Sequence, residues 1–235
     1  MIQHIYDEMW ENFSSGLILN QYQLDPNIHS SNDTRRGITA LAYLHTNNQS
    51  VSQAIDSFAK QVSLIEPQQY YHPIDELHLT LLAIISCVAG FELSQIDSRR
   101  YSDIFNDVMA SSEPITIHFR GITASASCIV VQGFPADSAL NDLRAKFRAA
   151  FKRSGLRTSI DSRYELVIAH TSVVRFCAPL QNSQQLLELC KRYKNYDFGS
   201  VVLRDIELVF NNWYQNLSCT HSLAQHVMDK QTAQL

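Results

Sequence analysis

Two segments of this 235-residue chain place a histidine two residues before a hydroxyl side chain, each within an apolar run. They are Leu77-His78-Leu79-Thr80-Leu81-Leu82 and Ala169-His170-Thr171-Ser172-Val173-Val174. In an extended strand, side chains at i and i+2 emerge on the same face, about 6.5–7 Å apart. Each segment therefore pairs an imidazole with a hydroxyl. Facing each other around one anion, the two pairs would supply two proton-transfer groups and two hydroxyl donors, which suits phosphodiester chemistry without a metal.

A third segment, His29-Ser30-Ser31, has the same bare pattern. It lies in a cluster of turn-forming residues between Asp25 and Asp33, which predicts a loop. The candidate catalytic residues are therefore His78, Thr80, His170 and Ser172. An unperturbed imidazole titrates near pH ~6.5, so one ring can act as base and the other as acid at neutral pH. The sequence does not assign the two roles.

Other side chains are candidates for binding the substrate. Arg175 could clamp a phosphate, although strict alternation puts it on the opposite strand face from His170, so that a bulge or the end of the strand would be required. Tyr71 and Tyr43 are candidates for stacking on a base. The run His72-Pro73-Ile74-Asp75-Glu76 offers metal-ligand residue types, but no third ligand with supporting spacing is evident. We expect no metal and no cofactor.

Composition narrows the function classes. A net charge of −4 argues against a protein that coats nucleic acid, yet it permits a small nucleotide or one RNA end in a local pocket. The five cysteines show no zinc-binding spacing, and neither a signal peptide nor a membrane-spanning run is evident. We therefore expect a reduced, cytoplasmic protein that makes no contact with membranes, and we expect a monomer.

Periodicity predicts a short amphipathic helix over residues 1–15, followed by alternating strands and helices. Strands are expected at 37–45, 76–86, 114–121, 125–133, 164–176 and 199–210, and helices at 49–65, 94–110, 136–154 and 183–193. The two histidine-bearing strands occupy related places in the two halves. We predict an α+β fold in which residues 1–235 form a single bilobal domain with an N-terminal extension at 1–35. Two pseudo-symmetric halves would bring antiparallel sheets together at a central cleft, with the helices outside.

At these two strands the sequence resembles the 2H phosphoesterase superfamily, named for its two His-x-(Thr/Ser) motifs. Two further features resemble the family: the strand 129–135 with the helix that follows it, and Arg175, which lies three residues past the second hydroxyl. The resemblance covers roughly residues 36–210. It implies a bilobal fold and action on 2′,3′-cyclic or 2′-5′ phosphodiester bonds of RNA ends or small nucleotides. The second hydroxyl is serine where threonine is common, and Thr171 is polar where an apolar residue is more usual.

Three functions remain open. The leading hypothesis is a metal-independent cyclic phosphodiesterase or 2′-5′ phosphoesterase. The first alternative is 2′-5′ RNA ligation on the same fold, and the second is a module that binds a nucleotide without turnover. The presence of both histidines and both hydroxyls favours an enzyme, because binding alone would not require two titrating groups.

Overall fold

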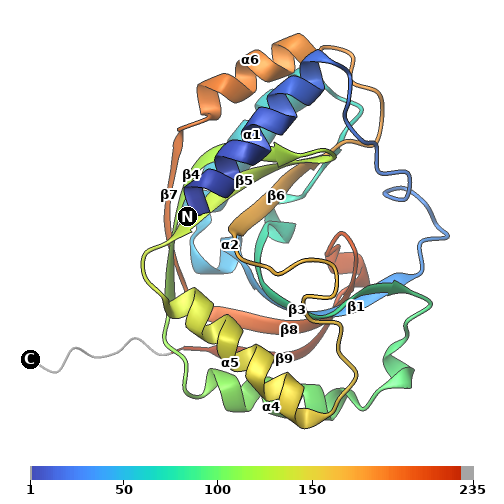
Figure 1. Cartoon of the computed structure of the whole chain (residues 1–235), viewed down its shortest axis with the longest axis vertical. Coiled ribbons are helices and arrows are strands. Elements are labelled where there is room, and N and C mark those ends of the chain that lie inside the picture. The colour runs from blue at the N-terminus through green and yellow to red at the C-terminus, as the bar shows by residue number, and fades with distance from the viewer. Residues whose placement is uncertain (1, 229–235) are drawn as a thin grey trace, which may run out of the picture.

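The computed structural model describes residues 2–228, and its strands form two antiparallel sheets (Figure 1). The strands are β1 (Arg35–Tyr43), β2 (Tyr70–Tyr71), β3 (His78–Ala89), β4 (Ile115–Ser125), β5 (Cys128–Pro135), β6 (Ala169–Arg175), β7 (Asp197–Leu203), β8 (Asp205–Asn212) and β9 (His221–Val227). One sheet has the order β3-β1-β8-β9 and the other β2-β6-β5-β4-β7. The predicted α+β class with two antiparallel sheets is confirmed; residues 1 and 229–235 of the predicted domain lie outside the described residues.

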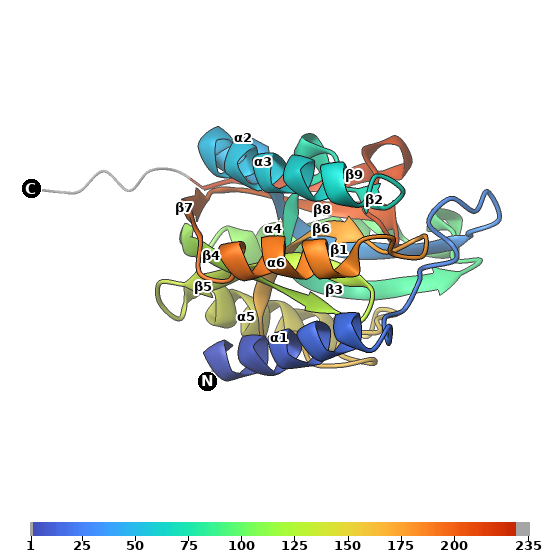
Figure 2. The same cartoon turned by 90° about the horizontal axis from the view of Figure 1, so that it is seen from above.

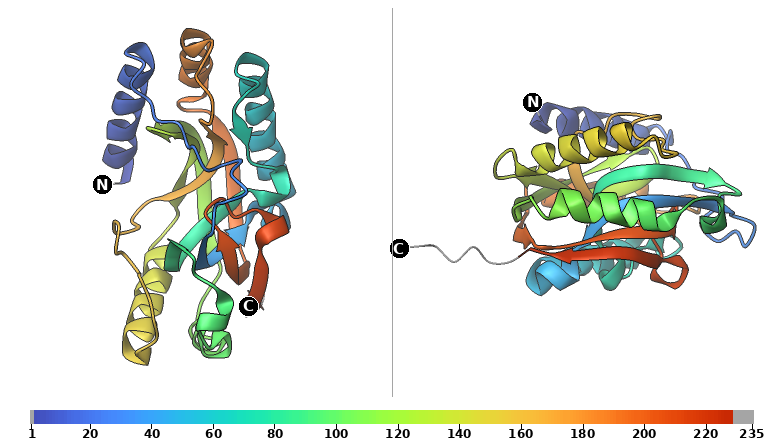
Figure 3. Two further views of the ribbon diagram at one scale, coloured as in Figure 1. Left: turned by 90° about the vertical axis from the view of Figure 1, so that its right-hand side faces the viewer. Right: turned by 90° about the horizontal axis from the view of Figure 1, so that it is seen from below.

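The five longer helices lie at the two ends of the molecule, and the short helix α2 (Leu44–Asn47) lies between them (Figure 1). The longer helices are α1 (Ile2–Ile18), α3 (Gln49–Ile65), α4 (Ser98–Met109), α5 (Ala139–Ser154) and α6 (Ser183–Tyr193). Helices α4 and α5 pack on the four-stranded sheet, whereas α1, α3 and α6 gather at the five-stranded sheet (Figure 3). The two halves of the chain are therefore interleaved, because α3 follows a strand of one sheet and packs on the other. None of the helices in residues 2–228 has both the length and the apolar character needed to cross a bilayer.

The predicted helices all form, and Gly155 ends α5 in the left-handed region at φ 66°. Two strand predictions were wrong in extent. The predicted strand 199–210 is two strands, β7 and β8, because the chain passes from one sheet to the other at Arg204. Strand β6 begins only at Ala169, and residues 156–168 form a loop. The apolar pattern alone does not reveal a change of sheet, because buried apolar residues occur in both strands, on either side of Arg204.

Helix α1 lies on the same face of the five-stranded sheet as the second histidine motif. Thr123 pairs in register with Val130, and Val130 pairs with Ser172, so these three side chains share a face. The hydroxyl of Thr123 donates to the carbonyl oxygen of Tyr6 at 3.2 Å. Helix α3 packs on the opposite side of the sheet, and α6 lies between the two helices when the molecule is seen from above (Figure 2). The N-terminal helix thus belongs to the wall of the molecule that carries His170.

The buried hydroxyl of Tyr6 fastens α1 to β5 and β6. It donates to the carbonyl oxygen of Ala169 and accepts from the amide of Gly133 at 3.3 Å. Replacement of Tyr6 by Phe removes both of these buried hydrogen bonds, so we expect the free energy of unfolding to fall by about 1–3 kcal/mol. Chemical denaturation measures the change. The matched control is Tyr196→Phe on the half-exposed side chain of Tyr196, and an equal loss in both variants would contradict the anchoring role.

Candidate active site

Both histidine motifs are followed directly by a β-bulge. In β3, Thr80 pairs with Leu41 but Leu82 pairs with Ala40, so Leu81 is the extra residue. In β6, Ser172 pairs with Val130 but Val174 pairs with Ile129, which makes Val173 the extra residue. A bulge shifts the following residues to the other face of the strand. The two motifs are therefore alike in backbone geometry as well as in residue type.

The bulge in β6 decides where Arg175 lies. Arg175 pairs with Cys128, which shares a face of β5 with Val130, the partner of Ser172. Arg175 consequently lies on the same face as His170 and Ser172, as the predicted phosphate clamp requires. A bulge is one of the two geometries predicted from the sequence to allow this position.

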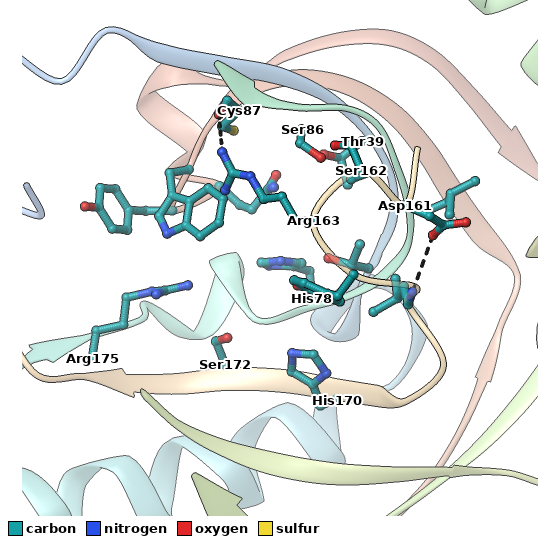
Figure 4. A pocket seen from close by; sticks show the side chains of 18 of the residues that line it. Thr39, His78, Ser86, Cys87, Asp161, Ser162, Arg163, His170, Ser172 and Arg175 are labelled. Atoms are coloured by element: carbon teal, nitrogen blue, oxygen red, sulfur yellow. Dashed lines mark hydrogen bonds between the residues drawn. The ribbon is translucent and has the colours of Figure 1, made fainter. Parts of the chain in front are cut away.

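One cavity between the two sheets brings the candidate catalytic residues together. His170 and Ser172 point into it from β6, and His78 faces them from β3 (Figure 4). Thr80 and Arg175 line the same cavity. Other parts of the wall include the loop at 161–166 and Trp213, Tyr214 and Gln215. Five residues from two widely separated segments of the chain are thus placed around a single space.

The two tyrosines predicted to bind substrate do not line this cavity. Tyr43 is buried in a small cluster with Leu41 and Val209, and its ring lies 6.4 Å from that of His78 in an edge-on contact. The hydroxyl of Tyr71 donates to the carbonyl oxygen of Glu66 at 2.7 Å. Tyr43 therefore supports His78 by packing, and Tyr71 is held away from the cavity by its hydrogen bond.

The ring of His78 is oriented by its own chain. Its Nδ1 lies 2.7 Å from the carbonyl oxygen of Glu76, which can only accept, so Nδ1 carries the proton and donates. The carboxylate of Glu76 accepts from the amide of Leu217 at 2.9 Å and from the side chain of Asn216 at 3.0 Å. These contacts fix the tautomer and leave Nε2 of His78 with a free lone pair.

Burial favours the neutral form of both motif histidines. Desolvation lowers the pKa of His78 to about 4, helped by the positive charge of Arg175. Desolvation likewise lowers the pKa of His170 to about 4, with further contributions from His78, Arg144 and Arg175. The expectation of an ordinary titration near neutrality is therefore wrong for the free protein. An anion between the rings would favour protonation of one of them, because opposite charge stabilises the imidazolium.

A third imidazole, that of His72, also lines the cavity. From the sequence, His72 was interpreted only as a possible metal ligand. It is 4% exposed, and neither ring nitrogen has a hydrogen-bond partner among the described residues. Its amide donates to the carbonyl oxygen of Val173, which extends the pairing of β2 with β6 and brings His72 beside the bulge. Burial, followed by the charge of Arg175, lowers its pKa well below the ordinary value. No sequence motif marks His72, since its position depends on this short edge pairing.

The cavity carries positive side chains without carboxylate partners. No ion pair to a carboxylate involves Arg175 or Arg163 among the described residues. Arg175 lies over the ring of Tyr214 at 5.5 Å, and its Nε is buried without a partner. The one acidic residue in the lining, Asp161, is bound by Arg148 at 2.6 Å. This charge distribution suits an anionic ligand. No group of three or more His, Cys, Asp or Glu within residues 2–228 is arranged to hold a metal ion.

Arg144 of α5 forms hydrogen bonds with the first motif strand and with the residue that precedes the second. Its guanidinium donates to the carbonyl oxygen of Leu81 at 2.8 Å, and to that of Ile168 at 2.9 Å. A third, longer contact of 3.3 Å reaches the carbonyl oxygen of Thr80. The side chain is fully buried, and burial lowers its pKa to about 10. Arg144 thus binds the bulge of the first motif and the residues that lead into the second.

Comparison with solved structures shows the same fold in other proteins. TT0787 of Thermus thermophilus matches with a TM-score of 0.60 at 14% identity, over 84% of this chain and 99% of that one. Escherichia coli LigT complexed with 3′-AMP matches with a TM-score of 0.54 at 12% identity, over 83% of this chain and 99% of LigT. A conserved protein of unknown function from Agrobacterium tumefaciens matches with a TM-score of 0.53 at 16% identity, over 93% of this chain and 98% of that one. Neither a family model nor a curated protein sequence matches.

These identities are low, so the likeness concerns the fold. It extends over nearly the whole length of each neighbour. A further structure, described as a phosphoesterase, matches with a TM-score of 0.52 at 14% identity. The chain therefore has the LigT-like α+β fold, and the fold that the resemblance to the 2H phosphoesterases implies is confirmed.

The depressed pKa values of the two motif histidines can be measured directly. We expect the imidazole NMR signals of His78 and His170 in the free protein to titrate near pH 4, because both rings are desolvated. Replacing Arg175 by Met removes a positive charge that lowers both values, so both pKa values should rise. Arg153→Met on the exposed side of α5 is the control.

The same shifts predict a pH dependence of stability. A folded-state pKa below the unfolded value of about 6.5 means that the unfolded chain takes up protons first. The free energy of unfolding should therefore fall as the pH drops from about 6.5 toward 4. Titration of both rings at the unperturbed value would contradict this account of the site.

Proposed function

We propose that the chain is a phosphoesterase that hydrolyses 2′,3′-cyclic or 2′-5′ phosphodiester bonds of RNA ends or small nucleotides, with two histidines as acid and base. One observation carries the proposal: two imidazoles and two hydroxyls, from strands of two different sheets, line one cavity that is rich in unpaired positive charge. The LigT structures with 3′-AMP, ATP and NADP+ support a small nucleotide as the kind of ligand for this fold.

We assign the role of base to His78. Its Nδ1–H is held by the carbonyl oxygen of Glu76, so Nε2 can accept a proton from the attacking water while the carbonyl stabilises the cation that forms. His170 takes the role of acid. The phosphate anion raises its pKa on binding, and the protonated ring gives its proton to the ribose oxygen as the phosphorus–oxygen bond breaks. The products are a phosphate monoester and a free hydroxyl.

The hydroxyls of Thr80 and Ser172 donate to the non-bridging phosphate oxygens, where charge grows in the transition state. Arg175 contributes a fixed positive charge on the same face of β6, and its partnerless Nε is free to bind a phosphate oxygen. The same groups would serve 2′-5′ ligation in reverse, with a ribose hydroxyl in place of water. All these roles need only protein donors, and the five cysteines, which are free thiols in the structure, suit a reducing cytoplasm.

The proposal predicts turnover that survives removal of metal ions. With EDTA present, the protein should hydrolyse 2′,3′-cyclic nucleotides or 2′-5′-linked dinucleotides. His78→Ala and His170→Ala should each lower kcat by at least about 100-fold, because each removes one proton-transfer group. Product release is followed by chromatography.

His29→Ala is the matched control, since His29 belongs to the same sequence pattern but is exposed in a turn. It should retain wild-type turnover. Tight nucleotide binding with no turnover by the wild-type protein would favour the binding module instead. Formation of longer 2′-5′-linked products from cyclic phosphate ends would favour ligation.

Arg144 is a positioning residue in this scheme, because it touches the backbone of β3 and of Ile168, the residue before β6, and not the substrate. Loss of its three hydrogen bonds lets the strands shift, and a displacement of about 1 Å at reacting groups can reduce kcat about 100-fold. We expect Arg144→Met to lower kcat far more than it raises KM. Arg144→Lys, which keeps the charge and some donors, should recover part of the loss.

The control is Arg153→Met, on the exposed side of the same helix. Thermal unfolding of each variant identifies any loss of folded protein. If Arg144→Met and Arg144→Lys are equally impaired and the KM alone changes, Arg144 does not act by holding the strands.

A further inference from the structure

A second cavity adjoins the candidate active site along β5 and β6. It shares His170, Ser172 and Arg175 with the first cavity, together with Trp213. Its own walls are Ile5 and Met9 of α1, Cys128 and Val130 of β5, and Val167 of the loop before β6. The two cavities therefore meet at the side chains to which the proposed function assigns the phosphate.

Helix α1 has a second apolar face that its packing does not use. Tyr6, Trp10 and Phe13 are buried against the body of the protein. Ile5 and Met9 are one turn apart on another face, half-buried, and line the second cavity. The anchoring of Tyr6 to Gly133 and Ala169 holds this face in place beside β6. The N-terminal helix thus forms a fixed wall next to the candidate active site.

The chemistry of the second cavity suits a nucleoside better than a second phosphate. Its walls away from the shared residues are mainly apolar, and the one acidic side chain there, Glu165, would repel an anion. Trp213 and Tyr164 add aromatic surface on which a base can stack. Ser125 and Ser127, near the turn between β4 and β5, supply hydroxyls for the polar edge of a base.

We propose that the second cavity binds a nucleoside joined to the far side of the reacting phosphate. The preferred substrate is then a phosphodiester with a nucleoside on each side, such as a 2′-5′-linked dinucleotide or RNA end, and a 2′,3′-cyclic mononucleotide fills only one side. This inference rests on the proposed function, because the position of the phosphate comes from it. The added element is the wall that α1 contributes.

The experiment narrows the cavity and compares two substrates. Met9→Trp in α1 and Val167→Trp in the loop before β6 each place a large ring in the second cavity. The quantity measured is the ratio of kcat/KM for 2′-5′-linked ApA to that for adenosine 2′,3′-cyclic phosphate. We expect this ratio to fall at least tenfold in both variants. Glu11→Trp, on the exposed side of α1, should leave the ratio at its wild-type value.

The outcomes separate the two proposals. If the wild-type protein turns over both substrates and neither variant changes the ratio, the second cavity does not bind the nucleoside, and the proposed function stands. If the wild-type protein turns over neither, the proposed function fails. Calorimetric binding of the same two ligands then tests the cavity alone: selective loss of ApA binding in both variants supports it, and no binding or an unchanged ratio overturns it.

Discussion

The site depends on two strands of different sheets being held side by side, and a buried cation holds them. Burying a guanidinium without a carboxylate is unfavourable unless its donors are satisfied. Arg144 meets this condition in part: its Nε and Nη2 donate to backbone carbonyl oxygens of Leu81, Thr80 and Ile168, whereas its Nη1 is buried without a partner among the described residues. The same charge also lowers the pKa of His170. One residue therefore sets both the spacing of the motifs and part of the electrostatics between them.

Acidic groups around the cavity are turned toward other partners. Asp161 pairs with Arg148, and the carboxylate of Glu76 is engaged by Asn216 and Leu217. The cavity is also lined by neutral imidazoles and by Arg175, which has no carboxylate partner among the described residues. Burial, helped by the positive charge of Arg175, keeps the imidazoles neutral, and an anion would oppose this by stabilising the protonated form. Binding of an anion in this cavity would therefore be coupled to proton uptake.

The sequence could predict the parts of the site that follow from a two-residue period. His78 with Thr80 and His170 with Ser172 share faces because alternation holds inside each motif. Alternation fails directly afterwards, at the bulges of Leu81 and Val173, which depend on pairing with neighbouring strands that the sequence does not identify. Because strand pairing cannot be identified from the sequence, the role of His72 in the cavity was missed and the strand 199–210 was predicted as one element. Tyr43 and Tyr71 were assigned to the cavity for the same reason. The helices were predictable because their apolar period is local.

The two motifs differ in the residue that follows the bulge and in the surroundings of the imidazole. Ala83 follows His78 at the same distance along the chain as Arg175 follows His170, and each lies just past the bulge of its strand. Both residues line the cavity. His78 has its Nδ1 fixed on a carbonyl oxygen, whereas Nδ1 of His170 is buried without a partner among the described residues. Two imidazoles in a repeated backbone setting thus have different surroundings. Such a difference is what allows groups of one chemical type to take opposite roles in acid–base chemistry.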